Sequence, residues 1–273
     1  SEIYKTGEQY VWSSAVDGAG NIYLGTGGEG KVFKVAASGA GALFCDLGEL
    51  NVTALATGTS GELFAGTSPD GKIYRIDASG KATFYFEPKE KYIWAIAVLN
   101  DGLAVATGDG GKIYKVRSAN ASPESSIFFD TSETHVISLA VDSRGNLYAG
   151  TDSNGIVIRF DASGKPFGLL DSPLREIHEL AVGPDGSVYA LALGESASAP
   201  KTDAAPPVAT AESKTVTAEK PNPLNPEPPA KSRYDLKEAK SAVYRIMPDG
   251  GSDLLWASGT VTAFSLYAHQ NGN

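Results

Sequence analysis

A 41-residue repeat constrains the fold of this chain more than any other feature of its sequence. The repeat is clearest in the stretch VISLAVDSRGNLYAGTDSNGIVIRFDASGKP, which begins at Val136. This stretch contains three short runs of β-type residues, and a fourth run, FGLLD, follows it. Gly, Asn, Asp and Ser separate the runs, and these residues tolerate the positive φ that a tight hairpin turn requires. Each repeat is therefore predicted to form four consecutive antiparallel strands.

The repeat recurs along almost the whole chain. The first strand of each unit opens at Val11, Val52, Ile93, Val136, Ile177 and Val261. Successive openings are 41 or 43 residues apart except for the last, which comes 84 residues after Ile177. Four-stranded antiparallel units of this length are typical of β-propeller blades. We therefore expect an all-β fold: a β-propeller with five complete blades, partial strands at both ends, and six or seven blades in the complete parent.

The blade boundaries follow from the repeat. We expect blades at residues 10–50, 51–91, 92–133, 134–175 and 176–259. Residues 1–9 are expected to form the fourth strand of a closing blade, because SEIYKTGEQYV aligns with ALFCDLGELNV. Residues 260–273 are expected to form the first strand of an incomplete blade. Unpaired strand edges attract other strands, so self-association through the open blade edges is a further expectation.

An insertion at residues 194–240 interrupts the loop between the second and third strands of the fifth blade. It holds 8 of the 15 prolines of the chain, and Tyr234 is its sole aromatic residue. Such a composition favours extended polyproline II backbone and buries too little apolar surface to fold alone. Two interpretations remain open: a solvated linker, or a peptide arm that docks on a partner or on its own propeller.

Composition excludes several classes of partner. The chain carries 23 basic and 32 acidic side chains, a net charge of −9. Nucleic-acid binding requires a basic stripe, so no nucleic-acid partner is expected. No apolar run approaches the ~20 residues that cross a bilayer, so no membrane insertion is expected. The single cysteine, Cys45, lies in the run ALFCDL and is predicted to be a small core hydrophobe.

The unit AVDxxGNLYAGTxxGKIYRIDASGK resembles the NHL, two-component-regulator-propeller and quinoprotein-like repeats of bacterial β-propellers. It looks most like long, uncharacterised secreted bacterial proteins, and this resemblance implies an extracytoplasmic location. The chain lacks the WD dipeptide of WD40 blades and the Trp-terminated AxDxxTGxxxW pattern of quinoprotein dehydrogenases. It also lacks a Walker motif and the alternating ligands of a calcium loop. We therefore expect no cofactor and no metal site.

The second place of each first strand is predicted to lie near the mouth of the axial channel, where propellers usually gather their function. This place varies along the repeat: Trp12, Thr53, Trp94, Ile137, His178 and Thr262. Trp12 and Trp94 lie two blades apart and could stack on a sugar or a peptide, or grip a cation. The alternative is that both pack between blades.

A second departure from the repeat is Glu179, which stands where the other units place Ser or Ala. An ionised carboxylate there needs water or a partner, and Arg175 or His178 could supply one. His135 stands at the start of the preceding blade, and the alternation of side chains along a strand places it on the same side of its strand as His178. His135, His178 and Glu179 could form a metal or acid–base cluster, although a local salt bridge or a wetted channel wall is the simpler interpretation.

These patterns predict a non-catalytic binding or scaffold module. Its ligand would be a protein or a carbohydrate, bound on the face that carries the loops between fourth and first strands and between second and third strands. The candidate ligand-binding residues are Trp12, Trp94, His135, Arg175, His178 and Glu179. No nucleophile elbow or Ser/His/Asp set is present, so no catalytic residues are expected. The alternative is a lactonase- or lyase-like propeller enzyme with a cluster at the channel mouth.

Overall fold

The computed structural model describes residues 3–117, 122, 126–194, 236 and 238–268. Within them the chain forms twenty strands, arranged as five blades of four. We call the strands of a blade A, B, C and D in chain order. Blade 1 consists of β1 (Tyr10–Val16), β2 (Ile22–Gly27), β3 (Lys31–Val35) and β4 (Gly41–Asp46). Blade 2 consists of β5 (Asn51–Thr57), β6 (Leu63–Ser68), β7 (Ile73–Ile76) and β8 (Ala82–Phe86).

The remaining three blades have the same order. Blade 3 consists of β9 (Tyr92–Leu99), β10 (Gly102–Gly108), β11 (Lys112–Val116) and β12 (Ile127–Asp130). Blade 4 consists of β13 (His135–Val141), β14 (Leu147–Asp152), β15 (Ile156–Phe160) and β16 (Pro166–Asp171). Blade 5 consists of β17 (Glu176–Val182), β18 (Val188–Leu193), β19 (Ser241–Ile246) and β20 (Ser252–Ser258).

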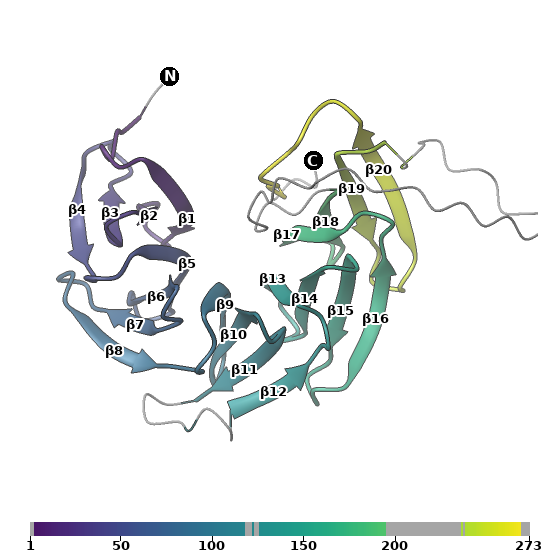
Figure 1. The fold of residues 1–273 in the computed structure, drawn as a ribbon, viewed down its shortest axis with the longest axis horizontal. Coiled ribbons are helices and arrows are strands. Elements are labelled where there is room, and N and C mark those ends of the chain that lie inside the picture. The colour runs from purple at the N-terminus through teal and green to yellow at the C-terminus, as the bar shows by residue number, and fades with distance from the viewer. Residues whose placement is uncertain (1–2, 118–121, 123–125, 195–235, 237, 269–273) are drawn as a thin grey trace, which may run out of the picture.

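The blades are arranged as an open arc, with strands β1, β5, β9, β13 and β17 innermost and strands β4, β8, β12, β16 and β20 outermost (Figure 1). Neighbouring strands within each blade pair antiparallel. Blades 1 and 5 face each other across the open side of the arc (Figure 1). The predicted all-β propeller of four-stranded antiparallel blades is confirmed.

Packing between blades explains why glycine recurs near the end of strand B. A Cβ on Gly25 would lie 2.8 Å from Val52, and one on Gly66 would lie 2.5 Å from Ile93. Val52 and Ile93 are the second residues of strands β5 and β9 in the following blades, and both are fully buried. Each glycine therefore makes room for a buried apolar residue of the next blade. Cys45 is buried among the core residues of blades 1 and 2, as predicted.

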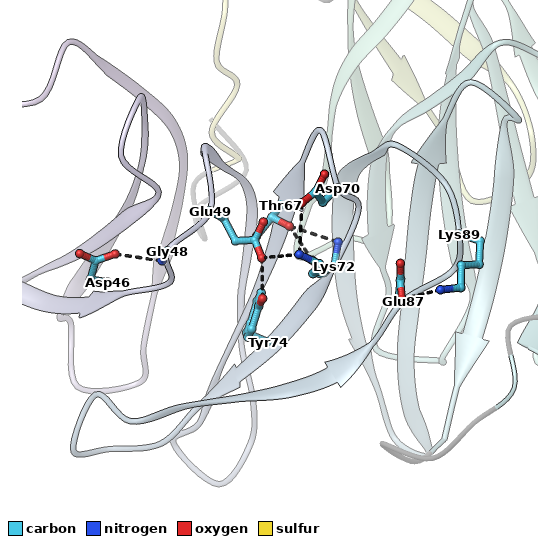
Figure 2. A network of polar contacts seen from close by, with 9 residues as sticks. All are labelled: Asp46, Gly48, Glu49, Thr67, Asp70, Lys72, Tyr74, Glu87 and Lys89. Carbon is cyan, nitrogen blue, oxygen red and sulfur yellow. Dashed lines mark hydrogen bonds and ion pairs between the residues drawn. The ribbon is translucent and has the colours of Figure 1, made fainter.

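Hydrogen bonds and ion pairs also join successive blades at the D–A and B–C loops. Glu49, in the loop before blade 2, accepts hydrogen bonds from Lys72 Nζ at 3.0 Å and from the Tyr74 hydroxyl at 2.5 Å (Figure 2). In blade 3, Glu90 accepts from Lys112 Nζ at 2.8 Å and from the Tyr114 hydroxyl at 3.2 Å. The same carboxylate and lysine positions therefore recur as an inter-blade contact.

The N-terminal segment departs from the expectation of a D strand at residues 1–9. No strand is assigned to residues 3–9, because a strand needs a hydrogen-bonded neighbour and none of the described strands pairs with this segment. Glu8 nevertheless contacts Lys31 Nζ at 3.0 Å, as Glu49 contacts Lys72. The Tyr4 ring packs 6.2 Å from that of Phe33. The segment therefore makes the contact with lysine that the loop between strands D and A makes in blade 2, but it does not form a strand D.

The C-terminal segment departs from expectation in the same way. Residues 260–268 carry no strand where a first strand was expected, and residues 269–273 lie outside the described part. The segment instead contacts blade 5 through single hydrogen bonds, among them Ser241 Oγ to the Val261 carbonyl at 2.7 Å. Most of the predicted insertion at 194–240 also lies outside the described residues. Its two ends are joined by the Gly194 amide, which donates to the Lys240 carbonyl at 2.9 Å.

No helix of the described residues is long and apolar enough to cross a membrane.

Candidate functional site

A repeated β-bulge sets the candidate residues of strand A apart from their neighbours. In each blade the pairing of strands A and B slips by one residue at the third residue of strand A, which is the second place of the repeat. The bulged residues are Trp12, Thr53, Trp94, Ile137 and His178. A bulge leaves one residue outside the regular pairing and re-aims its side chain. The most variable place of the repeat is therefore also the place where the backbone departs from regular pairing.

We call the end of the inner strands that adjoins the D–A and B–C loops the mouth. At the mouth of blade 3, Tyr92 and Trp94 stack with their ring centroids 5.2 Å apart and their planes 10° apart. The Trp94 indole donates a hydrogen bond from Nε1 to Nδ1 of His135 in blade 4, at 3.2 Å. The Asp109 amide donates to the same nitrogen at 3.3 Å. Two of the predicted site residues, Trp94 and His135, therefore form one unit.

Blade 1 carries a second aromatic pair at the equivalent position. Tyr10 and Trp12 stack with their ring centroids 5.4 Å apart and their planes 21° apart. Trp12 is 53% exposed and Tyr10 is 49% exposed. Val11 beside them is also 49% exposed, whereas its equivalents Val52 and Ile93 are fully buried against the preceding blade. The exposure of this pair therefore reflects the lack of a preceding blade among the described residues.

His178 pairs with a carboxylate that sequence reasoning missed. His178 Nδ1 lies 2.6 Å from Oε1 of Glu176, the first residue of β17, and Glu176 is fully buried. The Phe264 ring packs edge-on against the imidazole, with centroids 5.9 Å apart. Glu176 opens strand A two residues before His178, so both side chains could share a face. That spacing was the signal that could have identified Glu176.

Arg175 lies beside this pair and makes a separate contact. Its Nε donates to Oδ1 of Asp152, at 2.8 Å, and Asp152 is almost fully buried at the end of β14. The backbone places Asp152 opposite both His135 and Glu176. A broad pocket of about 590 Å³ adjoins Arg175. Its polar lining includes Ser153, Asn154 and Ser172.

Glu179 does not join these groups. Arg175 and His178, the two partners expected for it, make their hydrogen bonds with Asp152 and Glu176, and His178 acts on Glu179 as a nearby charge. Glu179 Oε2 instead accepts a hydrogen bond from the Leu266 amide. Burial raises the pKa of the Glu179 carboxyl, and this hydrogen bond lowers it in part. Glu179 therefore anchors the C-terminal segment.

The predicted cluster of His135, His178 and Glu179 does not form, since each side chain has the other contacts described above. Among the described residues, no group of three His, Cys, Asp or Glu side chains is placed to hold a metal ion. The mouth instead divides into three units. These are the Tyr10–Trp12 pair, the Tyr92–Trp94–His135 unit and the His178–Glu176 pair.

The fold and this mouth define a β-propeller that presents aromatic and titratable side chains at one end of its inner strands. No protein-family model matches the sequence, and neither does any curated protein. The particular repeat families that the sequence resembles thus gain no support from sequence comparison. Solved structures, in contrast, match over most of the chain.

These structures include lyases. A catalytically inactive histidine-to-alanine variant of virginiamycin B lyase from Staphylococcus aureus, with quinupristin, superimposes with a TM-score of 0.65 at 12% identity. That match covers 94% of this chain and 73% of the lyase. A streptogramin B lyase matches with a TM-score of 0.61 at 13% identity, over 88% of this chain and 66% of that one.

A third structure is a nidogen/laminin complex, which matches with a TM-score of 0.54 at 14% identity. The match covers 63% of this chain and 70% of the matched chain. At these identities the likeness shows the propeller fold alone. The same fold thus occurs in lyases and in a protein-binding complex, and fold alone does not assign an activity.

Proposed function

We propose that this chain is a non-catalytic binding module whose mouth holds a peptide segment of a protein partner. The observation that carries the proposal is the pair of stacked aromatic units, Tyr10–Trp12 and Tyr92–Trp94, at equivalent positions two blades apart. Tyr and Trp are the residues that most often dominate binding energy at protein interfaces. The nidogen/laminin complex offers a precedent for protein binding on this fold. An extracytoplasmic location remains part of the proposal.

The charge of the neighbouring loops favours a basic peptide. The B–C loops of blades 1 to 3 carry Glu29, Asp70 and Asp109, whose side chains are 64%, 61% and 42% exposed. Each pairs with a lysine, but Lys31 and Lys72 are each shared between two carboxylates. A cationic side chain of the peptide would therefore meet both acidic loops and aromatic faces.

Selection of a random peptide library displayed on phage tests this proposal. We expect enriched peptides that carry Lys or Arg, and synthetic versions that bind the chain in solution. Trp94→Ala should weaken that binding by at least about tenfold, because hot-spot aromatics contribute about 2 kcal/mol or more. Trp256→Ala is the matched control, since Trp256 is also partly exposed but lies on the outer strand β20.

Equal losses in the two variants would contradict the assignment of the mouth. Failure to enrich any peptide would overturn peptide binding. Binding of soluble oligosaccharides that Trp94→Ala abolishes would then favour a carbohydrate ligand, which stacks on the same aromatic faces.

A second candidate function is that of a lyase, and the His178–Glu176 contact favours it. A buried carboxylate that accepts a hydrogen bond from Nδ1–H fixes the imidazole orientation and leaves the lone pair of Nε2 free to act as a base. His178 is 23% exposed, so a substrate at the mouth could reach it. The two lyases of the same fold add support to this candidate.

Incubation with quinupristin, followed by liquid chromatography, tests the lyase candidate. If the chain is such a lyase, it should convert quinupristin. His178→Ala and Glu176→Gln should then reduce the rate by about 100-fold or more, the usual contribution of a general base. No conversion, or conversion that survives both substitutions, would count against this candidate.

A further inference from the structure

The two aromatic units at the mouth are built on the same plan but with different supports. Beside Trp12, the acceptor is the Asn51 side chain, whose Oδ1 receives the Gly28 amide at 3.4 Å. Beside Trp94, the acceptor is His135, whose Nδ1 receives the Asp109 amide at 3.3 Å. A Cβ added to Gly27 would meet both Trp12 Nε1 and Asn51 Oδ1. A Cβ added to Gly108 would likewise meet Trp94 Nε1 and His135 Nδ1. Asn51 Oδ1 and His135 Nδ1 thus occupy equivalent positions and accept equivalent backbone amides, and His135 Nδ1 also accepts the Trp94 indole. An amide does not titrate, whereas an imidazole does.

The contacts of His135 define its tautomer. The Trp94 indole N–H and the Asp109 backbone N–H can only donate, and both point at His135 Nδ1. Nδ1 must therefore carry a lone pair, and the proton of the neutral ring lies on Nε2. A second proton could enter only at Nδ1, where it would face both donors. Protonation of His135 thus requires that both hydrogen bonds break.

The surroundings of His135 keep the imidazole neutral at pH 7 and place carboxylates close to it. Burial is the largest influence and holds the pKa of His135 below its ordinary value; the carboxylates of Asp152, Asp109 and Glu176 offset part of that lowering, and Arg175 adds to it. Asp109 pairs with Lys91 at 2.7 Å, and the Tyr92 ring packs edge-on against the imidazole. His135 is therefore neutral at pH 7, with acids near enough to stabilise its charged form.

We propose that His135 is an acid-sensitive support of the Trp94 half of the mouth. Neutral His135 holds the Trp94 indole stacked on Tyr92 and ready for a ligand. Protonated His135 releases the indole, and the bound peptide leaves. The Trp12 half, which has Asn51 in the place of His135, keeps its geometry in acid. The loss of ligand rests on the proposed binding function, whereas the movement of Trp94 does not.

Nuclear magnetic resonance of the indole N–H groups tests the movement without any ligand. The chain has three tryptophans, so Trp12 and Trp256 serve as internal references. On acidification from about pH 7.5 to about pH 4, which extends below the ordinary histidine range because burial lowers the pKa of His135, the Trp94 signal should shift and exchange faster with water. Trp12 and Trp256 should not change. His135→Asn, which copies the native Asn51 support, should abolish the response of Trp94. An unmoved Trp94 signal, or the same shift in His135→Asn, would overturn the proposal.

Binding of a phage-selected peptide at the two pH values then tests the consequence. The ratio of the dissociation constants, acid over neutral, should be about ten or more for the wild type, since two hydrogen bonds to the support are lost. The ratio should fall to about one in His135→Asn. Binding with the same pH dependence in both proteins would overturn the switch and leave the binding function standing. If no peptide binds at any pH, the binding function fails, and the tryptophan signals alone decide the switch.

Discussion

Gly150→Val should destabilise this propeller by about 3 kcal/mol, at the upper end of the cost of overpacking a core. Gly150 is buried in β14, and an added Cβ would lie 2.5 Å from Ile177 Cγ2 and 2.5 Å from Ser138 Oγ. Ile177 is fully buried, and Ser138 Oγ donates to its carbonyl at 2.9 Å. The new side chain would therefore separate blades 4 and 5 and break the hydrogen bond that joins their inner strands. Denaturant unfolding followed by circular dichroism measures the loss.

Gly168→Val is the matched control for this substitution. Gly168 also lies within a strand, β16, but an added Cβ meets no atom within 4 Å. Valine favours extended backbone, so this substitution should be neutral or slightly stabilising. A similar loss at both positions would show that the cost comes from removing a strand glycine in general. The inter-blade packing argument would then fail.

The repeat could predict the blades because one pattern recurs five times with the same turn chemistry. Strand-forming runs and Gly/Asn/Asp turns fix the hairpins, and the recurring Gly-Thr pair marks the end of strand B in most blades. The terminal segments were harder, since a strand depends on a neighbour as well as on its own sequence. Residues 3–9 keep the Glu8–Lys31 contact of the repeat but have no strand partner in the described chain.

The candidate site could be predicted only in part. The variation at the second place of strand A identified Trp12, Trp94 and His178, but nothing in the sequence indicated the bulge that sets them apart. Glu176 and Asp152 were missed because they stand at strand ends outside the regular column of the repeat. Asp152 and its partner Arg175 are 23 residues apart, and a contact between such distant residues does not show in the periodicity of one strand. Glu176 and His178 lie two residues apart on β17, but that spacing alone does not show that their side chains meet.

Glu49→Ala should destabilise the chain by about 2 kcal/mol, the usual cost of losing hydrogen bonds to a charged group. The Glu49 side chain is 7% exposed and accepts from both Lys72 and Tyr74 of the next blade (Figure 2). Its removal leaves the partly buried Tyr74 hydroxyl without that acceptor. Asp70→Ala is the matched control, because Asp70 contacts the same Lys72 nitrogen at 3.2 Å but is 61% exposed. An exposed pair contributes about 1 kcal/mol at most, so this variant should remain close to the wild type.

Titration of Tyr74 provides an independent measure of the same contact. Burial, together with the hydrogen bond to Glu49, raises the pKa of Tyr74 to about 12. Between about pH 10 and that value the unfolded chain loses the Tyr74 proton first, so the stability of the wild type should fall as the pH rises. Without the Glu49 acceptor the Tyr74 pKa should move down toward its ordinary value, and the fall should become shallower. Tyrosinate absorbance and unfolding curves collected across this range measure both effects. Unchanged Tyr74 titration in Glu49→Ala would show that burial alone sets its pKa, and the stability lost in that variant would then belong to Lys72.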